Sequence, residues 1–86
     1  MRTFKEMFDE EMAELSKRFP NIVKLVRYAQ AEDDDILKGW ALSLTDMTSG
    51  DARRQQLDDI RAWIPSKDMN WQLDAILDGV AHEIIW

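Results

Sequence analysis

Apolar residues recur at helical spacing in the first part of the chain. Intervals of four, four, three and four residues trace one face of a helix, and they separate Phe4, Phe8, Met12, Leu15 and Phe19. Thr3 and Glu6 have the spacing of a capping box, so this helix is expected to begin at Thr3. It is expected to end near Arg18, because Pro20 disfavours helical geometry at the residue before it.

The segment NIVKLVRYAQA, after Pro20, contains β-branched residues that a strand would also accept. Its polar residues Lys24, Arg27 and Gln30 recur every three positions, which favours a short, largely buried helix. The acidic run EDDD, residues 32–35, follows this helix. We expect it to cap the next helix rather than bind a metal, because consecutive side chains on a helix point in different directions and no calcium-loop pattern follows.

A third helix is predicted over ILKGWALSLTDM, residues 36–47. One side of this helix would carry Ile36, Leu37, Trp40, Leu44 and Met47. Gly39 inside this helix costs about 1 kcal/mol relative to alanine. We expect the close approach of a neighbouring helix beside Trp40 to compensate for that cost.

Two further helices complete the pattern. TSGD, residues 48–51, is a turn in which Thr48 and Asp51 have capping spacing. The helix that follows directs Leu57, Ile60 and Ile64 inward and its three arginines outward. IPSKD is a corner, where Pro65 ends that helix and Ser66 or Asp68 caps the last one. The core face of the last helix, residues 69–86, would consist of Met69, Leu73, Ile76, Leu77, Val80 and Ile84.

These patterns predict an all-α protein, a compact single-domain bundle of about five short helices spanning residues 1–86. The connections are too short to separate a second domain. The chain has no cysteine, which excludes a disulfide framework and a thiolate metal site. The start, MRTFKEMFDEEMAEL, has no continuous apolar run, so neither a signal peptide nor a membrane span is expected, and the expected location is cytoplasmic.

Seventeen acidic and eleven basic residues give the chain a net charge of -6. This balance argues against direct contact with nucleic-acid phosphates, which requires a concentrated basic surface. It is compatible with a basic protein partner, although surplus acid also simply keeps a small domain soluble. The arginines Arg53, Arg54 and Arg61 stand among Asp51, Asp58 and Asp59, which favours a salt-bridged outer face over a DNA-reading helix.

Catalytic equipment is missing from the sequence. His82 is the only histidine, and Asp78 four residues earlier predicts a solvated pair along one helix face. No serine has the context of a nucleophile elbow, no Glu-x-x-His pair indicates a di-metal site, and no glycine-rich loop would cradle phosphates. The sequence therefore predicts a non-enzymatic protein with no catalytic residues, no metal site and no cofactor.

Three landmarks carry a resemblance to a known family: Phe19-Pro20-Asn21, then Trp40 with Leu44 and Asp46, then Ile64-Pro65-Ser66. Their order resembles the helical domain of the bacteriophage helicase loader-and-inhibitor family over most of residues 8–77. That family binds a replicative DNA helicase and brings it to an origin. The family has a second proline where Ser66 stands, and its flexible tail has no counterpart before Trp86. The resemblance therefore implies binding or inhibition rather than loading.

The candidate partner-binding residues lie on the outer side of the last helix: Trp71, Asp74, Asp78 and Ile85, together with Trp86. An aromatic anchor among acids is typical of a face that meets a basic, partly apolar protein surface. Alternatively, Trp71 and Trp86 fold back over the helix ends and complete the core, because tryptophan is usually well buried. Trp63, by contrast, is predicted to be structural.

The leading hypothesis for function is a small acidic adaptor or inhibitor, from a phage or mobile element, that docks on a host nucleic-acid-processing protein. A second hypothesis is a nucleic-acid mimic that blocks a basic groove, whose affinity would fall steeply with salt. A third is a structural subunit of a homo-oligomer. The sequence does not decide the oligomeric state.

Overall fold

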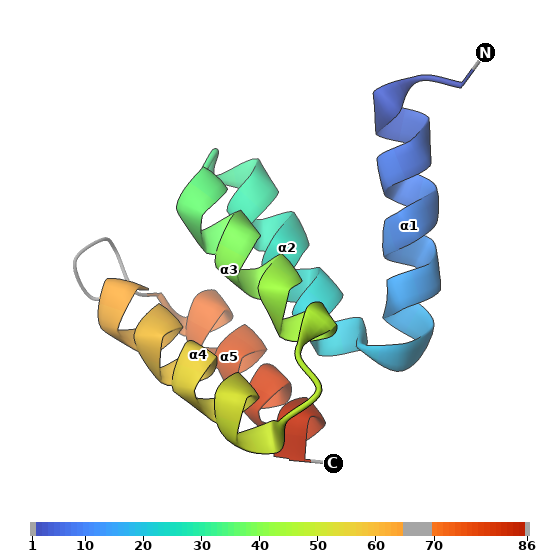
Figure 1. Ribbon diagram of the computed structural model, residues 1–86. Helices are drawn as coiled ribbons and strands as arrows, with labels where there is room; N and C mark the ends of the chain where they lie inside the picture. The colour runs from blue at the N-terminus through green and yellow to red at the C-terminus, as the bar shows by residue number, and fades with distance from the viewer. Residues whose placement is uncertain (1, 65–69, 86) are drawn as a thin grey trace.

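The computed structural model describes residues 2–64 and 70–85, and over these residues the chain forms helices joined by short turns (Figure 1). The helices are α1 (Phe4–Arg18), α2 (Pro20–Ala31), α3 (Asp35–Asp46), α4 (Gly50–Trp63) and α5 (Trp71–Ile85). No strand occurs in the described ranges. The predicted all-α bundle is confirmed, including the helical assignment of the β-branched segment after Pro20.

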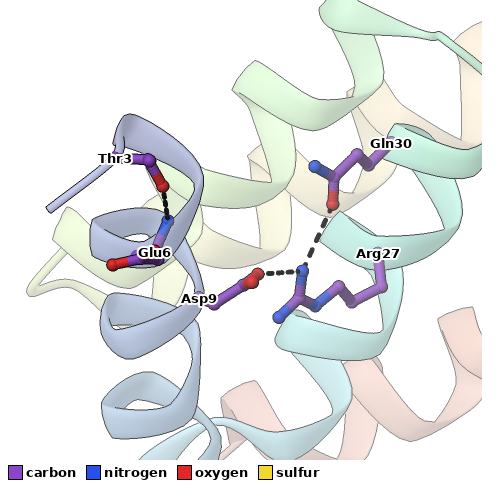
Figure 2. Close-up of polar contacts among 5 residues, drawn as sticks. All are labelled: Thr3, Glu6, Asp9, Arg27 and Gln30. Carbon is purple, nitrogen blue, oxygen red and sulfur yellow. Dashed lines mark hydrogen bonds and ion pairs between the residues drawn. The ribbon is translucent and has the colours of Figure 1, made fainter.

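Side-chain caps set the starts of the first and third helices, as the sequence predicted. Thr3 Oγ1 accepts a hydrogen bond from the backbone N–H of Glu6 at 3.1 Å (Figure 2). Asp34 Oδ1 accepts one from the backbone N–H of Leu37, also at 3.1 Å. Each bond satisfies a donor that has no partner within its own helix. The acidic run before α3 therefore contains a helix cap.

Two predicted caps are placed differently in the structure. The cap of α4 is Ser49, whose Oγ accepts from the backbone N–H of Ala52 at 3.3 Å, so the prediction of Thr48 is wrong by one residue. Asn70 Oδ1 accepts from the backbone N–H of Leu73 at 2.9 Å and caps α5. The described helix α5 begins after Asn70, and the predicted residues Ser66, Asp68 and Met69 lie outside the described residues.

The core is organised around α2. This helix contacts α1, α3 and α5, while α4 packs against α3 and α5. It buries five residues: Ile22, Val23, Leu25, Val26 and Ala29. Figure 1 shows α2–α5 stacked as two hairpin-like pairs, with α1 standing to one side. The inward face predicted for α4 is confirmed, and so is most of that predicted for α5, where Ile76 is only half-buried. The buried residues are Leu57, Ile60, Ile64, Leu73, Leu77, Val80 and Ile84.

The predicted apolar stripes include residues that are exposed to solvent in the structure. Phe4, in the first turn of α1, is 82% exposed, and Ile36, in the first turn of α3, is 49% exposed. Both belong to the apolar stripes that the sequence predicts, and neither is buried. Phe4 lies in the first turn of α1, whereas Ile36 is adjacent to Leu37, which is buried, so Ile36 lies at the exposed edge of its stripe. Periodicity identifies a face, but only a neighbouring helix buries it.

The close backbone approach expected at Gly39 occurs at Gly79 instead. A β-carbon at Gly39 would meet nothing within 4 Å, so the predicted compensation is wrong. A β-carbon at Gly79 would lie 2.6 Å from Oδ1 and 2.8 Å from Cγ of Asn21. A β-carbon at position 79 therefore fits the α2–α5 packing only if the Asn21 side chain shifts, whereas position 39 accepts a larger residue.

Alanine substitutions at the two glycines are expected to have opposite effects. Gly39→Ala should raise the free energy of unfolding by about 0.5–1 kcal/mol, through helix propensity alone. Gly79→Ala should lower it by about 1 kcal/mol, since overpacking costs about 1–3 kcal/mol and exceeds the propensity gain. Urea denaturation measures both effects. In an Asn21→Ala background the penalty at position 79 should disappear, and its persistence there would contradict this explanation.

Candidate partner-binding surface

Trp71 is the first residue of α5 and projects into solvent. Its side chain is 84% exposed, the largest fraction among the exposed large hydrophobic residues of the described chain. The helix turns its buried face, which includes Leu73 and Leu77, away from it. The outward direction predicted for Trp71 is therefore confirmed, and Trp71 is not part of the core. Trp86 lies outside the described residues.

The acidic residues near Trp71 differ in their contacts. Asp74 and Asp78 are exposed on α5, as predicted. Asp78 Oδ1 lies 3.5 Å from Nη2 of Arg61 on α4, so its ion-pair partner is Arg61 rather than the predicted His82. His82 is exposed. Ile85 ends α5, and its side chain lies outside the described part of the structure.

Glu83, a third acidic residue of α5, has a structural role instead. Its carboxylate accepts hydrogen bonds from the backbone N–H groups of Asn21 and Ile22, each at 2.9 Å. These are first-turn donors of α2, whose N-cap residue Phe19 makes no side-chain cap bond. Glu83 therefore caps α2 from the far end of the chain. The sequence signal was the missing cap itself, since Phe19-Pro20 offers no side-chain acceptor.

A groove of about 600 Å³ runs between α2 and α5 beside Trp71. The α2 wall consists of Val23, Lys24, Arg27, Tyr28, Ala31 and Glu32. The α5 wall consists of Trp71, Gln72, Ala75 and Ile76. Asn70 Nδ2 donates to the hydroxyl of Tyr28 at 2.8 Å, which fixes the end of α5 that carries Trp71 against α2. Since Glu83 contacts the other end of α2, the two helices run antiparallel.

The groove was not predicted, because the sequence pattern identifies Lys24 and Arg27 only as polar residues that recur along one helix. Figure 2 shows Arg27 pointing from α2 toward α1, where its Nη1 atom contacts Asp9 Oδ1 at 3.0 Å and Gln30 Oε1 at 3.4 Å. Its guanidinium also lies 5.6 Å from the ring centre of Phe8. Lys24 is exposed and makes no ion pair within the described residues.

A second, more open hollow of about 410 Å³ lies over the two tryptophans of α3 and α4. Trp40 and Trp63 meet edge to face, with ring centres 5.6 Å apart and an angle of 74° between the planes. Trp63 Nε1 donates to Asp34 Oδ2 at 3.4 Å. Both rings pack against the core, which confirms the structural assignment of Trp63.

The arginines of α4 do not form one uniform outer face. Arg54 is exposed, but Arg53 and Arg61 are half-buried. Arg53 lies over the ring of Phe19 at 5.3 Å and donates from Nη2 to the backbone carbonyl of Met47 at 2.6 Å. The prediction of three outward arginines is therefore wrong for Arg53, which joins α4 to the ends of α1 and α3.

Within residues 2–64 and 70–85, no group of three or more acidic or histidine side chains is placed to hold a metal ion. The described helices include none with the length and apolar character needed to cross a bilayer. No protein-family model matches this chain, and neither the curated proteins nor the solved structures searched contain a significant match.

Proposed function

We propose that this chain is a small, non-enzymatic protein-binding module that docks a partner at Trp71 and the adjoining groove between α2 and α5. The observation that carries the proposal is an indole ring that is 84% exposed at the edge of a mostly apolar hollow. Tryptophan is enriched among residues that dominate binding energy, particularly where it anchors in a contact rimmed by polar groups. Partner binding would bury the ring, which the fold leaves in water.

The module would act as an adaptor or inhibitor, since the described residues offer surfaces for contact and no grouping suited to metal chemistry. The resemblance to helicase loaders and inhibitors makes a replicative helicase of the host the first candidate partner. The sequence suggested a basic partner surface, an expectation based on the acids of α5. Of these, Asp74 remains exposed without an ion pair in the described structure, while Asp78 pairs with Arg61 and Glu83 caps α2.

The test is affinity capture from host lysate with two baits, the wild-type protein and its Trp71→Ala variant, each at low and high salt. A contact anchored by Trp71 is supported if only the wild-type bait captures a protein and the protein stays bound at high salt. Equal capture by both baits would contradict the proposed surface. Capture lost at high salt with either bait would favour nucleic-acid mimicry, because that mode depends on charge.

Replacing His82 by alanine is expected to leave partner affinity and stability nearly unchanged. His82 is exposed on α5, and the ion pair of Asp78 is made with Arg61. An exposed charged group contributes roughly 0–1 kcal/mol, so the dissociation constant should change by less than about fivefold. Isothermal titration with the captured partner measures this change. A larger loss would place His82 in the contact.

A further inference from the structure

The two walls of the groove beside Trp71 differ in chemistry. The α5 wall contains Trp71, Ala75 and Ile76 and no charged residue. The α2 wall places Lys24 and Arg27 three residues apart, with Glu32 at its far end. The acids Asp74 and Asp78, which suggested a basic partner, do not line the groove. The surface where Trp71 meets α2 is therefore apolar on one side, apart from Gln72, and bears two cations and the acid Glu32 on the other.

Both cations have N–H donors that can bind a further carboxylate. Lys24 makes no ion pair among the described residues, and an ammonium group offers three donors. Arg27 uses Nη1 for both of its hydrogen bonds, to Asp9 and Gln30, and a guanidinium has five N–H donors. Arg27 points toward α1 and is partly neutralised by Asp9, so Lys24 is the principal unpaired cation of the groove among the described residues.

The shape of the groove suits a helix. Its α2 wall extends from residue 23 to residue 32, which is about 13 Å of axis at roughly 1.5 Å per residue, or between two and three turns. Alanines 31 and 75 face the opening from the two walls, and small side chains allow a third helix to approach closely. An amphipathic helix would bury its apolar stripe against Trp71 and Ile76.

From these observations we infer that the partner, whose binding is the proposed function above, presents an amphipathic helix with acidic residues along one edge of its apolar stripe. Two carboxylates three residues apart would meet Lys24 and Arg27, while the apolar stripe covers Trp71. This occupant is the reverse in charge of the basic partner that the sequence suggested. A nucleic-acid strand would also carry negative charge, but the net charge of -6 and the apolar wall oppose it.

The inference is tested with two blocked, dye-labelled helical peptides of about 14 residues. One carries a leucine stripe edged by two glutamates three positions apart, and its twin carries lysines in their place. Fluorescence anisotropy on the full chain should show tighter binding of the glutamate peptide. Lys24→Glu should weaken that binding by about tenfold or more and strengthen binding of the lysine peptide. Arg54→Glu, an equal charge change on exposed α4, should alter neither.

Equal binding of the two peptides to the wild type, or no binding of the glutamate peptide, would overturn the inference. If Trp71→Ala weakens both peptides while Lys24→Glu affects neither, the proposed function stands and the acidic partner does not. If neither substitution affects binding of either peptide, both the proposed function and the acidic partner are contradicted. Preferential binding of a single-stranded oligonucleotide would overturn the inference. Light scattering that shows a dimer of the wild type and a monomer of Trp71→Ala would also overturn it, because a second copy of the chain would then occupy the groove.

Discussion

Glu83→Ala is expected to lower the free energy of unfolding by about 2 kcal/mol, although Glu83 lies in no catalytic or metal site. Its carboxylate accepts from the backbone N–H groups of Asn21 and Ile22, at the positive end of the α2 dipole. Hydrogen bonds to a charged group are worth about 1.5–3 kcal/mol, and the loss leaves first-turn donors without this acceptor. The effect should be large because α2 supplies five buried residues to the core.

Urea denaturation of two further variants gives the comparison for Glu83→Ala. Asp74→Ala removes the same charge from the same helix at an exposed position, and it should change stability by less than about 0.5 kcal/mol. Glu83→Gln keeps one acceptor oxygen without the charge and should lie between the wild type and Glu83→Ala. Equal urea midpoints for Glu83→Ala and Asp74→Ala would show that the cap contributes little.

The second large effect is expected at Trp71. Trp71→Ala should weaken binding of the captured partner by about 2 kcal/mol, or roughly thirtyfold, as is typical of an aromatic anchor. The same substitution should lower the melting temperature by no more than about 4 °C, because surface substitutions usually change stability by less than about 0.5 kcal/mol. Isothermal titration and thermal denaturation measure the two quantities on one preparation.

Phe4→Ala provides the matched control for Trp71→Ala. Phe4 is 82% exposed, but it lies in the first turn of α1 and not in the groove. Its replacement should leave affinity unchanged. If Phe4→Ala weakened binding and Trp71→Ala did not, the partner would contact α1 and the proposed surface would be wrong.

The helices were predictable because their signals are local. The Thr3 and Asp34 caps lie within three residues of the backbone groups they satisfy, and the stripe of Leu73, Leu77 and Val80 repeats along a single helix. The outward direction of Trp71 followed from the same geometry. The helices and most of their buried faces were therefore predictable from the sequence, with Phe4 and Ile36 as exceptions.

The groove and the α2 cap were not predictable, since each depends on residues that are distant in sequence. Asn21 and Glu83 are 62 positions apart, and nothing local connects them. In the same way, Lys24 and Trp71 share a surface only because α2 packs against α5. Gly79 could not be distinguished from Gly39 without knowledge that Asn21 faces it. The expectation about the partner's charge was therefore based on the acids of α5 alone and did not include Lys24 and Arg27 of the groove.

The cap supplied by Glu83 also bears on the order in which the chain acquires its structure during synthesis on the ribosome. Asn21 and Ile22 are synthesised 62 and 61 residues before their acceptor Glu83. A nascent chain that has completed α2, α3 and α4 still lacks the contact that caps the first turn of α2. The central helix thus gains its full stability only after the end of α5 has emerged from the ribosome.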